Sequence, residues 1–442
     1  MKKIRNILLT LIAMLLCCSP ILASKSYANN TLPNVSAHSY VIMDSKSGEI
    51  LYSKDANKKI YPASTAKMMT ALIALENCSL NKKITVKKSV LENIHPELSV
   101  VGIKAGYTYT LEELLNMLLI YSGADAADTI AVEIAGSVEA FAKMMTEKAL
   151  MLGMNNTNFD NPSGADFGGF DNTYSTANDI AKLTKEVMKN STIRKIVSKP
   201  SYTIKSFNNG SSKTIKNTNK FLNGQWYPSN LYKIIGTKTG TTDRAGYVLS
   251  TTAIDNYGRE IICSFFGNST RTKMYENIES LLTYTYKNVS TKYGWKQSNG
   301  KWYYYDKFGS LKKGWLSYDG DWYYLRSNGE MATGWLFDKG SWYYLKDNGS
   351  MATGWLFDKG SWYYLKDNGS MAKGWLFDKG SWYYLNDSGA MVTNTIIDDW
   401  SIDSNGIATP ILNIETPEDS DASLPEDSDT PLEEEIFLDF AI

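Results

Sequence analysis

Hydrophobic and polar positions divide the chain into two stretches with different patterns. Between residues 34 and 286, short runs of alternating apolar and polar residues stand near both ends, with longer apolar stretches between them. Alternation predicts half-buried strands, and the longer stretches predict buried helices. Residues 294–393 instead repeat an aromatic pattern every 20 residues. The sequence therefore predicts an α+β domain followed by a repeat array.

The α+β part is expected to form a sheet that unites its two ends, with helices between. Four segments predict two hairpins: residues 40–43 with 49–52, and residues 247–253 with 260–266. Helices are expected at residues 64–76, 111–120 and 271–286. The first is apolar nearly all round and hence buried, and Thr110 and Glu113 form a capping box for the second.

The repeats are expected to form a β-hairpin solenoid. The clearest copy, residues 334–351, contains Gly-Trp-Leu-Phe-Asp-Lys-Gly-Ser-Trp-Tyr-Tyr-Leu and then Asn-Gly-Ser-Met. Aromatic strands separated by Asp-Lys-Gly and Asp-Asn-Gly turns predict one hairpin per repeat. Because a single hairpin cannot bury its aromatic face, consecutive hairpins should stack on one another.

The two ends of the chain carry signals of their own. A basic start, an apolar run and Ser26-Tyr27-Ala28 predict a signal peptide and therefore export. From Glu415 to the end there are 11 acidic and no basic residues, so the tail should be disordered. No later segment is apolar enough to anchor the mature protein in a membrane. The expected segments are a signal peptide (1–28), the α+β domain (29–290), the repeats (294–410) and an acidic tail (411–442).

Composition argues against several kinds of chemistry. With 46 basic and 47 acidic side chains, the chain gives no case for nucleic-acid binding. His38 and His95 are its two histidines, which excludes a three-histidine zinc site and argues against a Ser-His-Asp triad. No metal or cofactor is expected. Cys78 and Cys263 are expected to be free thiols, with a disulfide as the alternative.

A serine and a lysine at the start of the first helix are candidates for nucleophile and base. Residues three apart on a helix share a face, so the Lys67 amine should lie beside the Ser64 hydroxyl. Burial can lower the pKa of a lysine toward that of a useful base. The spacing alone is a weak signal, because Ser79 and Lys82 share it. The buried context distinguishes the first pair.

A Lys-Thr-Gly tripeptide is the second candidate. We expect it at the end of a strand at residues 231–235. Lys238 can offer a positive charge to a carboxylate, and Thr239 and Thr241 can offer hydroxyl donors. Gly240 lets a ligand approach the backbone closely. An ordinary turn is the alternative.

Together with Ser122-Gly123-Ala124, these elements match the Ser-x-x-Lys, Ser-x-Asn and Lys-Thr-Gly set of penicillin-binding proteins and class A β-lactamases. Further similarity lies in residues 61–70, 161–164, 174–177 and 236–242. Residues 34–286 thus resemble low-molecular-weight penicillin-binding proteins, the serine-type D-alanyl-D-alanine carboxypeptidases of peptidase family S11. The resemblance implies a serine β-lactamase/DD-peptidase-like sandwich, peptidoglycan stem peptides ending in D-Ala-D-Ala as substrates, and β-lactams as covalent inhibitors.

The resemblance also implies residue roles. Ser64 would be the nucleophile, Lys67 the proton acceptor and Ser122 a proton relay. The residues expected to bind substrate are Lys238, at the terminal carboxylate, with Thr239, Gly240, Thr241 and Arg271. The amides of Ser64 and Thr241 would form the oxyanion hole. Ala124 stands where the family has asparagine, so we expect an active but slowed site, with Asp125 or a water compensating.

The repeats resemble the choline-binding modules of Gram-positive surface proteins. The resemblance implies aromatic cages for a quaternary ammonium, with packing of the solenoid alone as the alternative. The expected cages are Trp335, Trp342 and Tyr364, and Trp355, Trp362 and Tyr384. The protein is thus expected outside the cell, held on a choline-bearing or other wall polymer of a Gram-positive-type envelope.

Two other functions remain open. A class A-like β-lactamase would need a glutamate on a loop to hydrolyse its acyl-enzyme, and none lies between Glu147 and Glu186. A non-catalytic or weakly active wall-binding protein is the second alternative, motivated by Ala124.

Overall fold

The computed structural model describes residues 31–411 with the exception of residue 209. The expected signal peptide and nearly all of the expected acidic tail lie outside the described residues. Within the described chain, no helix is both long enough and apolar enough to cross a membrane. Two compact units are present. The first runs to Thr333 and includes the turn Asp347–Ser350, and the second comprises Gly334–Lys346 and the chain from Met351 onward.

The centre of the first unit is a five-stranded antiparallel sheet in the order β2-β1-β9-β8-β7. Its strands are β1 (Ser39–Asp44), β2 (Ile50–Lys54), β7 (Tyr232–Thr242), β8 (Gly246–Asp255) and β9 (Glu260–Asn268). Strand β1 pairs with β9, from Ser39 opposite Phe266 to Asp44 opposite Ile261. The two predicted hairpins and the sheet that unites both ends of the domain are confirmed.

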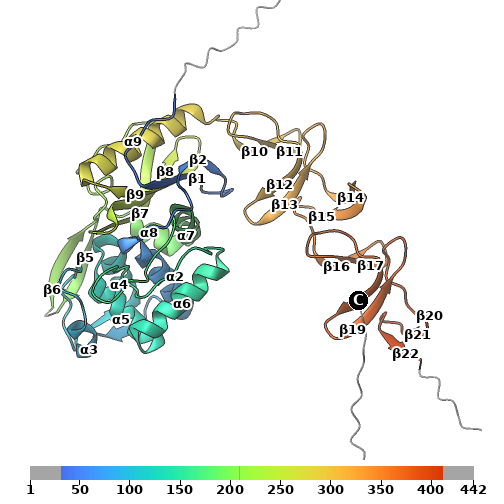
Figure 1. Ribbon diagram of the computed structural model, residues 1–442, viewed down its shortest axis with the longest axis horizontal. Coiled ribbons are helices and arrows are strands. Elements are labelled where there is room, and N and C mark those ends of the chain that lie inside the picture. Colours follow the sequence, from blue (N-terminus) through green and yellow to red (C-terminus); the bar gives the residue numbers. More distant parts are fainter. Residues whose placement is uncertain (1–30, 209, 412–442) are drawn as a thin grey trace, which may run out of the picture. The chain divides into compact units, whose positions relative to one another are not determined.

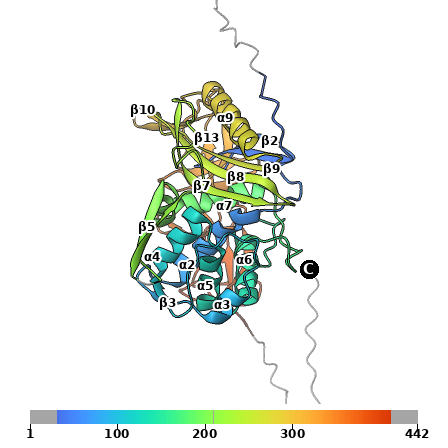
Figure 2. The same ribbon diagram turned by 90° about the vertical axis from the view of Figure 1, so that its left-hand side faces the viewer.

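Helices cover both faces of this sheet. Because successive strand residues point to opposite faces, Ile42 packs in the cluster that contains helix α9 (Arg271–Asn288). Val41 packs in the cluster that contains α7 (Ala177–Lys189) and α8 (Ser191–Val197). Figure 1 shows α9 on one side of the sheet and α7 and α8 on the other, and Figure 2 shows the same layers after a quarter turn. Cys263 on β9 is a free thiol in this core, and Cys78 is free as well.

A mostly helical part completes the α+β fold and carries two of the three motifs. Its elements are η1 (Ala63–Ala66), α2 (Lys67–Asn77), β3 (Lys83–Thr85), α3 (Lys88–Glu92), β4 (Thr108–Thr110), α4 (Leu111–Asn116), η2 (Met117–Tyr121), α5 (Ala124–Ala135) and α6 (Val138–Met151), with the flanking hairpin β5 (Ser201–Phe207) and β6 (Ser211–Lys216). Helix α2 is buried from Lys67 to Ala74, as predicted. Thr110 and Glu113 form the predicted capping box at the start of α4.

Each 20-residue repeat forms one antiparallel hairpin, as predicted. The hairpins are β10 (Gly294–Ser298) with β11 (Lys301–Tyr305), β12 (Gly314–Tyr318) with β13 (Asp321–Leu325), β14 (Gly334–Asp338) with β15 (Ser341–Leu345), β16 (Gly354–Asp358) with β17 (Ser361–Leu365), and β18 (Gly374–Asp378) with β19 (Ser381–Leu385). The remnant of a sixth repeat adds β20 (Thr395–Ile397), β21 (Trp400–Ile402) and β22 (Ala408–Pro410). In the Asp-Lys-Gly turn, Lys339 and Gly340 both have positive φ, 48° and 84°, as in a type I′ hairpin turn.

The first two hairpins belong to the first unit and pack on its α+β core. Tyr293 and Tyr304 are buried in the same hydrophobic cluster as α9 and β9. Asp319, in the turn between β12 and β13, forms an ion pair with Lys185 of α7 at 3.1 Å. The division between the compact units therefore falls after the second repeat.

Candidate active site

Ser64 lies in a tight turn at the start of buried helix α2. Ala63, just before it, has a φ of 46°, a left-handed conformation that costs a non-glycine residue about 1–2 kcal/mol. Gly164 fits against this turn so closely that a Cβ there would lie 1.9 Å from the Ala63 carbonyl oxygen. The segment 161–164 therefore supports the backbone that presents Ser64.

The Lys67 amine lies beside the Ser64 hydroxyl, as the spacing predicts. Its Nζ donates to Ser64 Oγ at 3.0 Å and to the carbonyl oxygen of Ser163 at 2.7 Å. The side chain is 1% exposed, and this burial lowers the pKa of Lys67 to about 8, against the opposing effect of the Asp128 and Asp125 carboxylates. Such a pKa leaves roughly a tenth of the amine unprotonated at pH 7. Lys67 can therefore accept the Ser64 proton.

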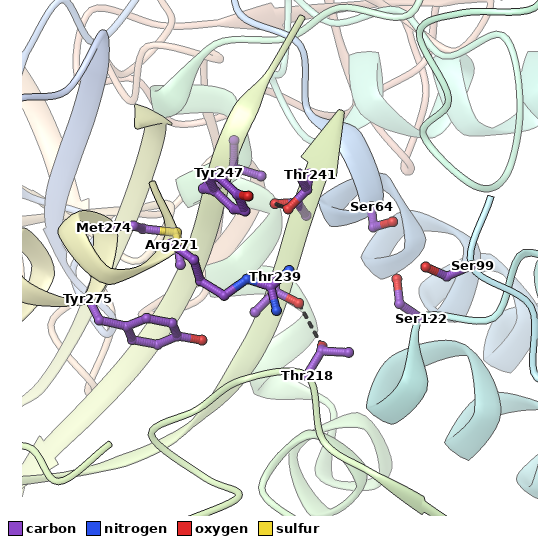
Figure 3. A pocket seen from close by; sticks show the side chains of 12 residues that line it. Ser64, Ser99, Ser122, Thr218, Thr239, Thr241, Tyr247, Arg271, Met274 and Tyr275 are labelled. Atoms are coloured by element: carbon purple, nitrogen blue, oxygen red, sulfur yellow. Dashed lines mark hydrogen bonds between the residues drawn. The ribbon is translucent and has the colours of Figure 1, made fainter. Parts of the chain in front are cut away.

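Ser122 faces Ser64 from the helical part of the fold. It ends η2 in a left-handed conformation with a φ of 75°, and its backbone N–H donates to the Met117 carbonyl. Figure 3 shows the hydroxyl groups of Ser64, Ser99 and Ser122 turned toward one another. The structure thus brings the two predicted catalytic serines together. Ser99 joins these two serines, although no sequence motif around it predicts a role in the site.

The Lys-Thr-Gly motif forms the opposite wall. It lies inside strand β7 and not after a strand ending at residue 235, because β7 stays paired with β8 as far as Thr242 opposite Gly246. At Gly240, a Cβ would lie 2.9 Å from the backbone nitrogen of Ser64 and 2.9 Å from the Ala63 Cβ. Glycine is therefore needed for the strand to approach the nucleophile's backbone.

Lys238 and Arg271 are the basic residues near this wall. Lys238 is 1% exposed, and its Nζ donates to the Thr239 carbonyl at 3.0 Å. Burial, reinforced by the Lys67 cation, holds the pKa of Lys238 well below its usual value. Arg271 does line the cleft, with its guanidinium 5.5 Å from the ring centre of Tyr247. The cation that faces the cleft is thus Arg271, whereas Lys238 lies within the wall.

These elements enclose a cavity of about 120 Å³. Its lining residues are Ser64, Ser99, Ser122, Thr218, Thr239, Gly240, Thr241, Tyr247, Val248, Arg271, Met274 and Tyr275. Figure 3 shows Thr239, Thr241 and Arg271 on the wall opposite Ser122. Thr218 is a residue the sequence did not mark, and its hydroxyl lies 2.6 Å from that of Thr239. All predicted catalytic and substrate-binding residues except Lys67 and Lys238 line this cavity.

The middle motif differs from its expected form in its third position. Ala124 is fully buried, and its backbone N–H donates to the Ser99 carbonyl at 2.7 Å. The Asp125 carboxylate accepts three hydrogen bonds from the backbone N–H groups of residues 101–103, at 3.0, 2.7 and 3.1 Å. Asp125 is therefore committed to that segment. The expectation that it replaces the missing asparagine as a hydrogen-bond partner is wrong.

Aromatic rings meet between successive hairpins of the second unit. Trp335 lies 6.3 Å from Trp342 of its own hairpin and 4.9 Å from Tyr363 of the next, measured between ring centres. Met371 N donates to the Trp342 carbonyl at 2.8 Å, which joins the two hairpins as the predicted stacking requires. Trp342 remains 42% exposed, so the ring cluster has an open side.

The third ring of each expected cage contacts a tryptophan of its own hairpin. Tyr364 pairs across its own hairpin with Trp355, at 5.2 Å between ring centres, and Tyr384 pairs likewise with Trp375 at 5.1 Å. Because neighbouring strand residues point to opposite faces, the ring that meets the preceding hairpin is the residue before each. Accordingly, Tyr383 lies 4.8 Å from Trp355. The rings that meet the preceding hairpin are therefore Tyr363 and Tyr383, and the part of Tyr364 and Tyr384 in a cage stays a prediction.

The fold and the cleft define the class of penicillin-binding proteins and serine β-lactamases, with a serine beside a buried lysine, a second serine opposite and a Lys-Thr-Gly strand. Sequence comparison narrows this class. The profile of the D-alanyl-D-alanine carboxypeptidase family, peptidase S11, matches residues 26–270, which is more than half of the chain. This chain belongs to that family.

Individual relatives show the extent of the similarity. The D-alanyl-D-alanine carboxypeptidase DacF of Bacillus subtilis is 32% identical over 259 residues, which cover 58% of this chain and 63% of DacF. The chain thus spans less than two thirds of DacF. DacB2 of Mycobacterium tuberculosis, another D-alanyl-D-alanine carboxypeptidase, is 34% identical over 236 residues, 53% of this chain and 77% of DacB2.

Solved structures agree with these relatives. Penicillin-binding protein 5 from Haemophilus influenzae aligns with a TM-score of 0.53 and 27% identity over 59% of this chain and 73% of its own. A point mutant of the Streptomyces K15 DD-transpeptidase aligns with a TM-score of 0.52 and 30% identity over 57% of this chain and 98% of its own. In the repeats, the choline-binding repeat profile matches residues 293–334, 313–355, 332–368 and 352–395.

Proposed function

We propose that this protein is a serine-type D-alanyl-D-alanine carboxypeptidase, which removes the terminal D-alanine from peptidoglycan stem peptides. The observation that carries the proposal is the buried Lys67 amine, 3.0 Å from Ser64 Oγ at a cleft lined by Ser122 and the Lys-Thr-Gly strand. The names of the relatives support the same reaction and substrate.

In the acylation step, Ser64 Oγ attacks the carbonyl carbon of the penultimate D-alanine while Lys67 takes its proton. The negative charge that develops on the carbonyl oxygen is stabilised by the backbone amides of Ser64 and Thr241. The tetrahedral intermediate then collapses as its C–N bond breaks. Ser122 relays a proton to the leaving D-alanine nitrogen. Water subsequently hydrolyses the ester and regenerates Ser64.

Substrate orientation rests on the carboxylate of the terminal D-alanine. Arg271 provides a cation in the cleft, and Thr239 and Thr241 provide hydroxyl groups. Lys238 lies within the wall, and its direct contact with the carboxylate stays a prediction.

Covalent labelling tests the reaction. Mass spectrometry after treatment with penicillin should place the adduct on the peptide that contains Ser64, and Ser64→Ala should abolish it. Ser79→Ala is the matched control, since Ser79 has a lysine at the same spacing but is exposed. The absence of an adduct on a folded protein would support the non-catalytic alternative, and an adduct on another residue would refute the role of Ser64. Rapid release of the adduct as hydrolysed penicillin would instead support the β-lactamase alternative.

The repeats are proposed to hold the enzyme at the wall, outside the cell, through a choline-bearing or related polymer. Open clusters of aromatic rings such as Trp335, Trp342 and Tyr363 suit a quaternary ammonium, which binds to ring faces. The full chain should be retained on cell walls and released by free choline, and Trp342→Ala should weaken its retention. Phe308→Ala is the control, because it removes an exposed ring of the first repeat, outside these clusters. Retention that Trp342→Ala and choline leave unchanged would refute this role.

A further inference from the structure

Helix α5 places a second carboxylate one turn beyond Ala124. Residues four apart lie on the same helix face, so Asp128 follows Ala124 along the face that carries the middle motif. Asp128 lines a cavity of about 410 Å³ together with Asn161 and Ser163. This is the Ser163 whose carbonyl oxygen accepts a hydrogen bond from Lys67 Nζ at 2.7 Å. Asp128 thus borders the same cavity as the segment that binds the Lys67 amine, without forming an ion pair with Lys67.

Of the charged groups that act on Asp128, Lys67 is the cation. Burial raises the pKa of Asp128 to about 7, the Lys67 cation opposes this rise, and Asp125 and Glu139 add to it. Glu139, at the start of α6, and His95, in the loop after α3, are the other titratable groups that line the cavity. Asp125 is held by the backbone of residues 101–103. Among the described residues, no hydrogen-bond donor holds the Asp128 carboxylate in the same way.

We propose that Asp128 is a positioning residue for Lys67, whose carboxylate stabilises the ammonium formed when Lys67 takes the Ser64 proton. The proposal rests on the proposed function and assigns to Asp128, through its charge, the stabilisation of the Lys67 ammonium for which Ala124 offers no amide. The proton moves from Ser64 Oγ to Lys67 Nζ as the new C–O bond forms. It leaves Lys67 toward the departing nitrogen through Ser122. Asp128 acts through its charge and gains no proton in this step.

The sign of the effect follows from the charge. A nearby carboxylate favours the protonated form of an amine, so its removal lowers the pKa of Lys67. In Asp128→Asn the acid limb of the acylation profile should therefore move to lower pH, by about 1 unit. The plateau at high pH should fall, roughly three- to tenfold, because a less basic amine is a weaker proton acceptor. The two profiles should thus converge or cross at low pH.

The test is the second-order rate of Ser64 labelling by a fluorescent penicillin, measured in the full chain between about pH 5 and pH 10. Asp128→Asn is close to isosteric, and its melting temperature checks the fold. Glu139→Gln is the matched control, since it removes a carboxylate from the same cavity. A fall by one factor at every pH would indicate a merely structural role and overturn the proposal. Equal shifts in both variants would overturn it as well.

A direct titration keeps this test independent of activity. The Cε chemical shift of Lys67 in lysine-labelled protein, assigned by its loss in Lys67→Arg, reports the pKa of the amine. A lower pKa in Asp128→Asn than in the wild type supports the electrostatic pairing even if the wild type is not labelled by penicillin. In that case the carboxypeptidase proposal fails separately. An unchanged Lys67 titration overturns the inference.

Discussion

Replacing Gly240 by alanine perturbs the turn that presents the nucleophile and leaves every catalytic side chain unchanged. The added Cβ would lie 2.9 Å from the Ser64 backbone nitrogen, 2.9 Å from the Ala63 Cβ and 2.8 Å from a Val248 methyl. Ordinary contacts between such atoms lie at about 3.5–4.0 Å, so strand and turn must separate by roughly 0.5–1 Å. A displacement of about 1 Å commonly costs roughly 100-fold in rate, and overpacking costs about 1–3 kcal/mol of stability. We expect acylation to fall by about ten- to 100-fold.

The assay compares the labelling rate by fluorescent penicillin with the melting temperature of the same protein. Gly236→Ala is the control on the same strand, because its Cβ would meet side chains, at 2.9 Å from a Val197 methyl and 3.4 Å from the Met188 sulfur. Both variants should lose stability, and only Gly240→Ala should lose most of its acylation rate. Wild-type labelling by folded Gly240→Ala would refute the reasoning, and so would an equal loss in Gly236→Ala.

Three further outcomes follow from the same geometry. The acylation rate should rise with pH through about 8, because the folded-state pKa of Lys67 is depressed and the neutral amine is the base. Lys67→Arg should lower this rate roughly 100-fold or more, and a rate that does not change with pH in the wild type would contradict the role of Lys67. A chain ending at Ser290 should melt several degrees below one ending at Thr333, because it loses the buried rings of the first two hairpins, each worth about 1.5–3 kcal/mol; calorimetry showing equal melting would contradict this. Ala124→Asn should raise the acylation rate by up to about tenfold in the otherwise wild-type protein, and by more when Asp128→Asn is also present. An unchanged rate in both backgrounds would mean that the cleft is built around alanine.

The fold of the first unit could be predicted largely because its elements are specified locally. The alternating segments became β1, β2, β8 and β9, and the capping residues Thr110 and Glu113 begin α4. The length of β7 could not be predicted, since its glycine- and threonine-rich end lacks an alternating pattern and is held by pairing with β8. The extent of the first unit could not be predicted either. The first two repeats have the same sequence pattern as the others. Contacts between residues distant in sequence, such as Lys185 with Asp319, attach them to the first unit.

The site could be predicted where one motif contains both partners. Ser64 and Lys67 are three residues apart on one helical turn, so their hydrogen bond follows from the spacing. Ser99 could not be found in this way, because tertiary packing brings it to the site. The ring contacts between hairpins could not be predicted for a different reason. Tyr363 and Tyr364 are identical neighbours, and only the direction in which the hairpins stack decides which one meets Trp335.

The central claim is that Ser64 carries the acyl group during hydrolysis of a peptide ending in D-alanyl-D-alanine. The most direct measurement is release of D-alanine from diacetyl-L-lysyl-D-alanyl-D-alanine, with the protein quenched during turnover and its peptides weighed. The account predicts steady release by the wild type, a peptidyl ester on Ser64, and neither in Ser64→Ala. D-alanine release that persists in Ser64→Ala, or an acyl group on another residue, would contradict it.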